Sequence, residues 1–401
     1  MTSRRKEAFS YTKAIITIMK NKKAVVVGGS NGIGLATVHE LLNRGYTVTV
    51  VDKLQPDIPS DKEKINYIFC DLQKFKSEIF EELSKDPDVE LLMITAGLGR
   101  VADFEYLHES EIQKLFDINA SATIKIIRCF YERIKGDEPF YCGVMGSVAG
   151  LVCSPMFSVY AATKAAVCRF TESVNIELEC AGTQNRILNV CPGSVKGTKF
   201  NGGENELSLI SKLASDIISK IFEREETFIP NSEIYNDVIA RYKNDPHKFG
   251  TESYIYKKNS GRVSNEKQAK IGYLSGTFDL FHIGHLNVIK RAKEQCDYLI
   301  VGVHKDASHK GKETFIPFEE RIEIVGACKY VDKVVVSEKE DSTAWELHKF
   351  DILFVGSDYK GSERFLRYEK FFEDKNVKIE YFPYTQGTSS TQIREHITNK
   401  K

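Results

Sequence analysis

Three residues in the first half of the chain have the types and spacing that a proton-transfer site needs. They are Ser147, Tyr160 and Lys164. Tyr160 and Lys164 are four residues apart, so they share one face of a helix. A carbonyl that is being reduced needs a proton on its developing oxyanion, and a tyrosine supplies it when a nearby cation lowers its pKa. We therefore expect Tyr160 as the acid, Lys164 as the cation and Ser147 as a hydrogen-bond donor to the same oxygen.

A glycine-rich stretch upstream predicts a nucleotide cofactor. Residues 25–34 read Val-Val-Val-Gly-Gly-Ser-Asn-Gly-Ile-Gly, a strand followed by the start of a helix. Glycine lets such a turn approach a pyrophosphate, which the amides at the helix start bind. Taken alone, the glycines also fit any tight strand-to-helix turn. The expected cofactor contacts are Gly28, Asn31, Gly32, Ile33 and Gly34.

Asp52 strengthens the dinucleotide interpretation and indicates which dinucleotide binds. It ends the second expected strand, where a carboxylate accepts hydrogen bonds from both adenosine ribose hydroxyls and repels a 2′-phosphate. This favours NAD(H) over NADP(H). The neighbouring Lys53 leaves NADP(H) open as an alternative.

A pair of histidines in the second half points to phosphate chemistry. Residues 276–285 read Gly-Thr-Phe-Asp-Leu-Phe-His-Ile-Gly-His, which places His282 and His285 at the start of an expected helix. They could be a metal pair, but no further Cys or His completes a zinc shell nearby. The helix terminus and two imidazole donors instead suit triphosphate oxygens during displacement at the α-phosphorus. Lys310 and Lys312 suit a phosphate clamp, although they could almost as well be solvated lysines on the surface.

Two runs of alternating strands and helices must position these residues. Short β-branched runs alternate with helical stretches over residues 22–230 and again over 270–401, the rhythm of parallel α/β sheets. We expect two doubly wound, Rossmann-like domains in tandem, preceded by an extension over residues 1–21. Residues 231–269 read as one helix near 232–242 and then a linker. The expected strands are 24–27, 47–51, 67–70, 91–95, 141–145, 186–190, 227–229, 271–275, 298–303, 333–336, 352–355 and 378–382.

Composition narrows the class of protein further. The 401 residues are 42% hydrophobic and 28% charged, with Lys plus Arg (56) equal to Asp plus Glu (56). Such a chain is neither disordered nor drawn by a basic field to nucleic acid or to a membrane. The nine cysteines include no Cys-x-x-Cys pair. We therefore expect reduced thiols and a cytoplasmic location.

Residues 22 to about 230 resemble the short-chain dehydrogenase/reductase family. The matching pieces are Gly28/Gly32/Gly34, Asp71-Leu72, Thr95-Ala96-Gly97, Asn119, Ser147, Tyr160-x-x-x-Lys164 and Pro192-Gly193. The resemblance implies that Asp71 lies near the adenine and that Asn119 and Lys164 hold a proton-relay water. It also implies cofactor contacts from Leu72, Ala96, Gly97, Pro192 and Gly193. Two positions depart from the family pattern: Thr95 replaces an Asn, and Thr198 sits one residue late. The segment 199–208 is short and polar, which favours a small hydrophilic substrate.

Residues 270 to about 397 resemble the His-x-Gly-His nucleotidylyltransferases, and most closely the bacterial glycerol-3-phosphate cytidylyltransferases. The resemblance implies CTP with Mg²⁺, no confident protein ligand to the metal, and phosphate contacts from His282, His285, Lys310 and Lys312. The remaining implied nucleotide contacts are Gly276, Thr277, Phe278, Asp279, Gly356, Asp358, Thr388, Ser389 and Ser390. Lys329 and Tyr384 stand where the family has Arg, so the phosphorylated acceptor is expected to differ.

Fusion of the two halves suggests that one product feeds the next reaction. We expect reduction of a ketose phosphate to an alditol phosphate, with ribulose 5-phosphate as the first choice, and then cytidylyl transfer to give a CDP-alditol for a wall or capsule polymer. Alternatives are a CDP-glycerol product, and a choline-phosphate, ethanolamine-phosphate or adenylyl transferase fused to an unrelated reductase. A cofactor-sensing first half is a further alternative. Both families imply a homodimer or homotetramer.

Overall fold

The computed structural model describes residues 22–58, 64–201, 204–266, 269–305, 313–383 and 392–394. The chain divides into two compact units, Met1–Glu266 and Lys267–Lys401. Over the described ranges, none of the helices has the length and apolar character that crossing a membrane requires.

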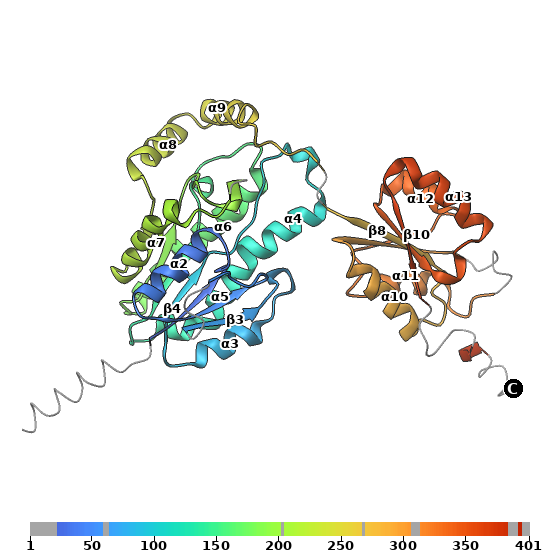
Figure 1. The fold of residues 1–401 in the computed structure, drawn as a ribbon, viewed down its shortest axis with the longest axis horizontal. Helices are drawn as coiled ribbons and strands as arrows, with labels where there is room; N and C mark the ends of the chain where they lie inside the picture. Colours follow the sequence, from blue (N-terminus) through green and yellow to red (C-terminus); the bar gives the residue numbers. More distant parts are fainter. Residues whose placement is uncertain are drawn as a thin grey trace, which may run out of the picture. The chain divides into compact units, whose positions relative to one another are not determined.

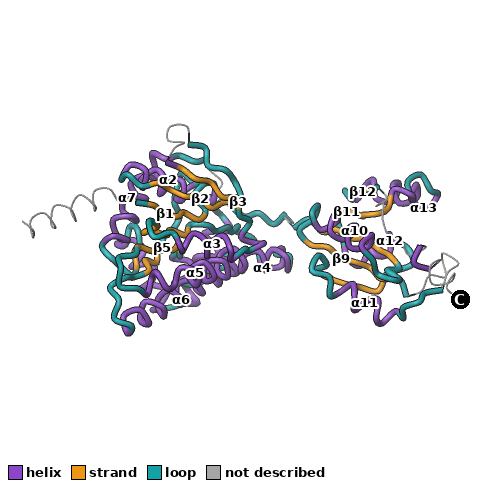
Figure 2. Tube along the Cα trace, turned by 90° about the horizontal axis from the view of Figure 1, so that it is seen from below, coloured by secondary structure: helices purple, strands orange, loops and turns teal. Residues whose placement is uncertain are grey.

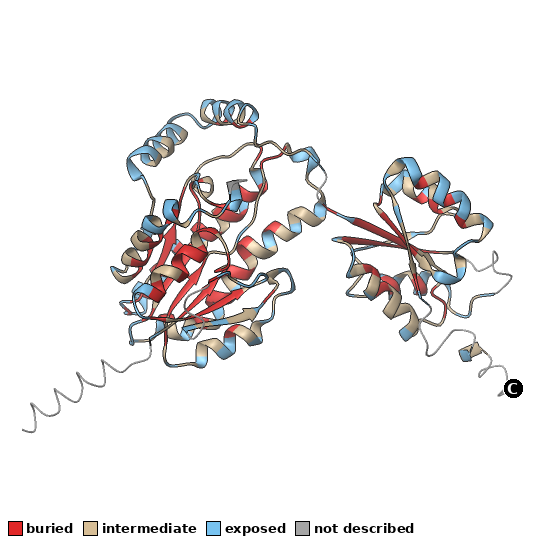
Figure 3. Cartoon of the chain, in the orientation of Figure 1, coloured by how far each residue is buried: buried red, intermediate tan, exposed pale blue. Residues whose placement is uncertain are grey.

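The first unit is built on a seven-stranded parallel sheet in the order β3-β2-β1-β4-β5-β6-β7. Its central strands are apolar on both faces because helices cover both faces of a parallel sheet. Residues 24–27 of β1 are fully buried, and Figure 3 shows the same burial along the neighbouring strands. The strands are β1 (Lys23–Val27), β2 (Thr47–Asp52), β3 (Ile65–Phe69), β4 (Val89–Ile94), β5 (Tyr141–Met145), β6 (Ile187–Val190) and β7 (Thr227–Phe228).

Helices lie around this sheet (Figure 2), and two hydrophobic layers hold them to it. Leu41 of α2 and Ile217 of α7 belong to one layer, and Phe80 of α3, Phe130 of α5 and Val167 of α6 belong to the other. The helices are α2 (Gly32–Asn43), α3 (Ser77–Lys85), α4 (Glu109–Phe116), α5 (Ala122–Lys135), α6 (Ser158–Cys180) and α7 (Leu207–Phe222), with short turns η2 (Leu72–Lys74), η3 (Phe104–Tyr106), η4 (Asp117–Ser121), η5 (Val148–Gly150) and η6 (Lys199–Asn201).

After the last strand of the first unit, the chain forms a helix pair where the sequence reading expected one helix and a linker. The helices are α8 (Ser232–Asn244) and α9 (Pro246–Lys258) (Figure 1). Asp245 is the N-cap of α9 and Pro246 is its first residue. The Asp245 carboxylate accepts the Lys248 N–H at 2.9 Å, and a proline at the first helical position loses no hydrogen bond.

The second unit has a five-stranded parallel sheet in the order β10-β9-β8-β11-β12. Ile289 of α10 and Val325 of α11 pack on one face, and Ala344 of α12 and Phe372 of α13 pack on the other. Figure 1 shows these two helix pairs on opposite sides of the strands. The elements are β8 (Ile271–Gly276), α10 (Ile283–Lys293), β9 (Tyr298–Val303), α11 (Phe318–Gly326), β10 (Lys333–Val336), α12 (Asp341–His348), β11 (Ile352–Gly356), η8 (Ser357–Tyr359), α13 (Glu363–Phe372), η9 (Glu373–Lys375) and β12 (Lys378–Phe382).

Strand order reverses beside the first strand of each sheet. In the first unit β1 lies between β2 and β4, and in the second β8 lies between β9 and β11. In doubly wound sheets, ligands bind at the carboxyl edge at this switch point. The two Rossmann-like sheets confirm the predicted fold class, and every expected strand is present within two residues of its predicted limits.

Candidate active sites

A cavity of about 540 Å³ opens at the carboxyl edge of the first sheet. Ser147, Tyr160 and Lys164 line it together. All the residues predicted from the sequence to bind the cofactor also line it: Gly28, Asn31, Gly32, Ile33, Gly34, Asp52, Asp71, Leu72, Ala96, Gly97, Pro192 and Gly193. The structure therefore brings the predicted acid, its partners and the glycine turn to one place.

The glycine turn is packed so closely that side chains are excluded from it. Gly28 has a φ of +84°, and a Cβ there would lie 2.5 Å from the amide nitrogen of Ala96. A Cβ on Gly34 would lie 2.1 Å from the carbonyl oxygen of Gly28. The Thr95 hydroxyl lies 3.0 Å from the carbonyl oxygens of both Val27 and Gly28. Thr95 therefore ties the ends of β1 and β4 together. The bare backbone is the cradle that a pyrophosphate needs.

Asp52 keeps acceptor capacity for a ribose. Its two carboxylate oxygens accept the backbone N–H groups of Ser30 at 3.0 Å and of Leu54 at 3.1 Å. An ionised carboxylate has about four lone-pair directions, so two are left for hydroxyl donors. The neighbouring Lys53 ammonium lies 3.2 Å from the Asp71 carboxylate, which directs its charge to that residue.

Asn205 lies against the glycine turn, a contact that was not predicted from the sequence. Its amide oxygen accepts the Gly32 N–H at 3.0 Å, and its amide nitrogen donates to the Asn31 side chain at 2.9 Å. The methyl group of Thr198 also faces Gly32, since a Cβ there would lie 3.5 Å from it. No motif announces this contact, because it joins residues more than 170 positions apart.

Burial is the main cause of the pKa shifts of Tyr160 and Lys164, the acid–base groups at the start of α6. It raises the pKa of Tyr160 to about 12, although a hydrogen bond with Ser147 acts in the opposite direction. Burial likewise lowers the pKa of Lys164 to about 8, and its ammonium donates to the Met145 carbonyl at 2.7 Å. The expected lowering of the phenol pKa by Lys164 does not appear, because burial dominates and the groups that act on the phenol are Ser147, Cys168 and Cys191. Tyr160 therefore holds its proton at neutral pH, which is the form that can donate it.

Asn119 is not among the residues that line the cavity, but it is fully buried and bonded to neighbouring segments. It lies in a π-helical turn, η4, and its amide nitrogen donates to the Leu98 carbonyl at 2.8 Å and to the Thr163 hydroxyl at 3.1 Å. Its amide oxygen accepts the Leu98 N–H at 2.9 Å. A Cβ on Gly97 would lie 3.4 Å from this oxygen and 3.3 Å from the Lys164 ammonium. Asn119 thus joins the wall after β4 to the helix that carries Tyr160.

Two aromatic rings, which the sequence reading did not single out, cover Tyr160. Phe157 stacks on its ring with centroids 4.2 Å apart, and Phe200 lies 5.3 Å from it. Gly99 lies beside both stacked rings, since a Cβ there would come within 2.7 Å of the Tyr160 ring and 3.1 Å of the Phe157 ring. The segment expected to be polar therefore contributes an apolar wall, which limits the access of water to the phenol.

In the second unit, the turn after β8 adopts unusual backbone angles. Phe278 and Leu280 have φ values of +53° and +51°, a region that residues other than glycine rarely occupy. The Phe278 ring is buried against Gly276 and lies 5.4 Å from the His285 ring. The Thr277 hydroxyl is buried and has no hydrogen-bond partner within the described part of the chain. A buried hydroxyl of this kind fits a triphosphate oxygen.

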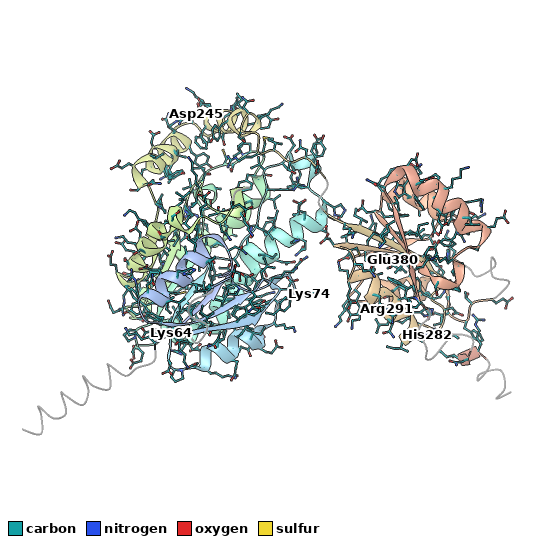
Figure 4. The ribbon with its side chains drawn as sticks, in the orientation of Figure 1. Lys64, Lys74, Asp245, His282, Arg291 and Glu380 are labelled. Carbon is teal, nitrogen blue, oxygen red and sulfur yellow. The ribbon has the colours of Figure 1, made fainter. Side chains whose placement is uncertain are left out.

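The backbone fixes the tautomers of the two histidines at the start of α10, where Figure 4 labels His282. His282 Nδ1 accepts the Gly284 N–H at 3.0 Å, and His285 Nδ1 accepts the His282 N–H at 3.4 Å. Their rings stack with centroids 4.0 Å apart, and burial lowers the pKa of His282. A neutral imidazole whose Nδ1 is an acceptor carries its hydrogen on Nε2. Each ring therefore presents an Nε2–H donor, as phosphate binding requires.

Asp279 holds neighbouring segments of the second unit together, and its predicted contact with the nucleotide stays a prediction. Its buried carboxylate accepts the backbone N–H groups of Phe315 at 3.1 Å and Ile316 at 2.9 Å, and it pairs with Arg394. These partners adjoin the segments predicted to bind phosphate. Those predicted residues lie outside the described part of the chain: Lys310, Lys312, Tyr384, Thr388, Ser389 and Ser390.

Arg321 is a buried cation that the sequence reading left without a role. It is 1% exposed, and its guanidinium donates to the carbonyl oxygens of Ile316 at 2.9 Å and His304 at 2.8 Å. It also donates to the carbonyl oxygens of Thr277 and Lys305. One side chain thus joins the turn after β8 to the end of β9.

Gly356 and Lys329 lie at opposite edges of the second sheet. Gly356 ends β11, which pairs with β8, so it shares the carboxyl edge with the histidine turn. Asp358 folds back onto it, since a Cβ on Gly356 would lie 2.3 Å from the Asp358 carboxylate. Lys329 precedes β10 and therefore lies at the amino edge, 5.2 Å from the centroid of the Tyr330 ring. Residues that precede parallel strands lie at the opposite edge of the sheet from residues that follow them, so within this unit Lys329 does not share an edge with the histidine turn. Its predicted substrate role stays a prediction.

Among the described residues, no group of three or more His, Cys, Asp or Glu side chains is gathered as a metal site.

Comparisons with known proteins find a different family in each half of the chain. The short chain dehydrogenase family matches residues 22–207, and the cytidylyltransferase-like family matches residues 273–396. The glycerol-3-phosphate cytidylyltransferase of Bacillus subtilis is 32% identical over 126 residues, which are 30% of this chain and 92% of that protein. An uncharacterized oxidoreductase of Saccharomyces cerevisiae is 26% identical over 251 residues, which are 58% of this chain and 80% of that protein.

Among solved structures, a short chain dehydrogenase from Burkholderia cenocepacia in complex with NADP is 18% identical to this chain, with a TM-score of 0.49. The match covers 58% of this chain and 98% of that one. The family matches and the similarity to the Bacillus subtilis protein place the second unit in the cytidylyltransferase-like family, and the first unit matches the short chain dehydrogenase family. The chain is a bifunctional oxidoreductase and nucleotidyltransferase.

Proposed function

We propose that the two units catalyse successive steps. The first reduces a ketose phosphate to an alditol phosphate with NADH, and the second transfers CMP from CTP to that phosphate, releasing pyrophosphate. Ribulose 5-phosphate, ribitol 5-phosphate and CDP-ribitol are our first choice of substrate, intermediate and product. Such a product suits the synthesis of a polymer of the cell wall or capsule.

The observation that carries this proposal is the presence of two sets of reactive residues on one chain. Ser147, Tyr160 and Lys164 line one cavity, and His282 and His285 stack at the start of α10 in the other unit. Tethered enzymes gain most when they share an intermediate. The similarity to a glycerol-3-phosphate cytidylyltransferase supports an alditol phosphate as that intermediate.

In the reductase unit, each residue has a separate task. Bound NADH supplies the hydride to the carbonyl carbon. Tyr160, which burial keeps protonated, gives its phenolic proton to the carbonyl oxygen, and Ser147 hydrogen-bonds the same oxygen. The Lys164 ammonium stabilises the phenolate that is left. Phe157 and Phe200 restrict water around the phenol.

Asp52 supports NADH as the cofactor. It has two acceptor positions left for ribose hydroxyls, and a carboxylate repels a 2′-phosphate. The polarity of residues 199–208 supports a small hydrophilic substrate, with Phe200 as one apolar wall.

In the transferase unit, an oxygen of the alditol phosphate attacks the α-phosphorus of CTP. The bond from that phosphorus to the oxygen that bridges it to the β-phosphorus breaks, and pyrophosphate leaves. A bound Mg²⁺ would neutralise part of the charge on these phosphates. The Nε2–H groups of His282 and His285 and the amides at the start of α10 stabilise the charge that builds on the phosphates.

Two further proposals concern the setting of the enzyme. All nine cysteines are free, which supports a reducing cytoplasm. A homodimer or homotetramer is proposed by analogy with both families.

The test is to incubate the full chain with CTP, NADH and one ketose phosphate at a time, and to identify the product by mass spectrometry. Ribulose 5-phosphate is expected to give NADH oxidation, pyrophosphate and CDP-ribitol. Dihydroxyacetone phosphate tests the CDP-glycerol alternative, and phosphoethanolamine with CTP alone tests an unrelated fusion. Pyrophosphate release with phosphoethanolamine, and none with any alditol phosphate, would refute the proposal.

A further inference from the structure

The helix pair α8–α9 packs against the reductase unit, and one of its contacts is with a residue that lines the cavity. From α8, Tyr235 lies against Gly193, where a Cβ would come within 1.9 Å of the tyrosine hydroxyl oxygen. From α9, Gly250 faces Cys153, where a Cβ would lie 3.3 Å from the sulfur. The helix pair is therefore part of the reductase unit and supports the site.

The segment that contacts α9, residues 154–157, continues into α6, the helix that carries Tyr160. Residues 154–157 form a turn in which the Phe157 N–H donates to the Ser154 carbonyl at 3.0 Å. Met156 within it has a φ of +60°, a strained conformation for a residue other than glycine. The turn ends at Phe157, whose ring stacks on Tyr160. The shape of this turn therefore sets where the Phe157 ring lies against the phenol.

Lys257 of α9 holds this turn with a buried ammonium group. Its Nζ donates to the Ser154 hydroxyl at 2.7 Å, to the Pro155 carbonyl at 2.9 Å and to the Ser253 hydroxyl at 3.2 Å. The residue is 9% exposed, and burial lowers its pKa to about 8. These three acceptors are neutral. A buried cation with neutral partners is costly compared with an apolar side chain of the same size. Stability alone therefore does not account for a lysine here.

We propose that Lys257 is a positioning residue of the reductase site, which holds the 154–157 turn so that Phe157 keeps Tyr160 in its proton-donating orientation. Lys257 itself touches neither the substrate nor the cofactor. Its effect passes through the turn, then Phe157, then the phenol. Misplacement of a reacting group by about 1 Å can cost roughly a hundredfold in rate.

The test compares Lys257→Met with Lys258→Met. Methionine keeps the length of the side chain but removes the ammonium, and Lys258 is an exposed lysine on the same helix. In Lys257→Met, kcat for the ketose phosphate that the wild type reduces is expected to fall about 10- to 100-fold. The dissociation constant for NADH, measured by its fluorescence, is expected to stay within about twofold, because the glycine turn is not touched. Lys258→Met is expected to match the wild type in both.

A second variant guards against a folding defect. Ser154→Ala removes one acceptor of the lysine without deleting the lysine itself, and it is expected to lower kcat by roughly 3- to 10-fold with NADH binding retained. An unchanged kcat in Lys257→Met would overturn the proposal. A parallel loss of NADH binding and kcat in both variants would also overturn it, since that pattern marks general damage to the unit.

Hydrogen exchange gives a readout that does not depend on the substrate. Amides of residues 154–160 are expected to exchange faster in Lys257→Met than in Lys258→Met, and the rest of the first unit is expected to be unchanged. The inference rests on the oxidoreductase assignment and not on the identity of the ketose. If the wild type reduces no ketose phosphate, the proposed substrate fails, while unchanged exchange at 154–160 would still refute the role of Lys257.

Discussion

Replacement of Asp52 by asparagine is the most informative change to the cofactor site. The carboxylate accepts the Ser30 N–H through one oxygen and the Leu54 N–H through the other. Asparagine has only one side-chain oxygen, so one of these N–H groups would face an NH₂ group. The substitution also removes the negative charge that we expect to discriminate between NADH and NADPH.

The size of the effect follows from the strength of the hydrogen bonds. Bonds to a charged group contribute about 1.5–3 kcal/mol, and neutral ones about 0.5–1.5 kcal/mol. Asp52→Asn exchanges a hydrogen bond to a charged group for a neutral one, and the difference between them is about 1–1.5 kcal/mol. This difference corresponds to roughly 5- to 13-fold weaker NADH binding. Asp52→Ala removes the acceptor entirely, so the loss is about 10- to 150-fold for a single bond. NADPH binding is expected to strengthen in both variants because repulsion of its 2′-phosphate is relieved.

The assay measures dissociation constants for NADH and NADPH by fluorescence titration of the full chain. The matched control is Asp57→Asn, which removes an exposed carboxylate from the same loop and is expected to change neither constant by more than about twofold. The ribose role of Asp52 is refuted if the ratio of the two constants is the same in the wild type, Asp52→Asn and Asp52→Ala.

Three other predictions concern the remaining site residues. Lys164→Met should abolish reduction yet stabilise the protein by about 2 kcal/mol at pH 7. The Lys164 pKa is about 8 in the folded state and 10.5 in the unfolded state, so keeping the buried ammonium charged destabilises the wild type by about 3 kcal/mol. Loss of the ammonium's hydrogen bond in the variant offsets about 1 kcal/mol of that gain. Between pH 8 and 10.5 the unfolded state binds more protons than the folded state, so the stability of the wild type rises with pH. The extra stability of Lys164→Met in urea unfolding should therefore shrink over this range, and extra stability that grows with pH would contradict the prediction. His285→Ala should abolish pyrophosphate release from CTP and leave NADH oxidation unchanged, and loss of both activities would argue against separate sites. Asp279→Asn should destabilise the second unit by about 1.5–3 kcal/mol in urea unfolding and weaken CTP binding, because Arg394 loses its charged partner; unchanged values in both measurements would show that the pair is dispensable.

The sequence by itself determined the parts of this protein that depend on local geometry. The periodicity of strands and helices depends on neighbouring residues in the sequence, so the limits of every strand could be predicted to within two residues. The four-residue spacing of Tyr160 and Lys164 needs only a helix to bring them together, and a glycine turn needs only φ values that other residues avoid. The shared cavity follows because parallel strands end at one edge.

Tertiary packing decided which of the remaining residues support the sites. Asn205, Lys257 and Arg321 make their contacts with backbone or side-chain atoms that no spacing rule connects to them. Lys329 was predicted to contact the substrate because the family has Arg at its position, yet its place before β10 puts it at the opposite edge of the sheet from the histidine turn. Burial, which depends on every neighbouring element, raised the pKa of Tyr160 where a local argument predicted a fall. These properties depend on surroundings assembled from distant parts of the chain, and a local pattern carries no information about distant neighbours.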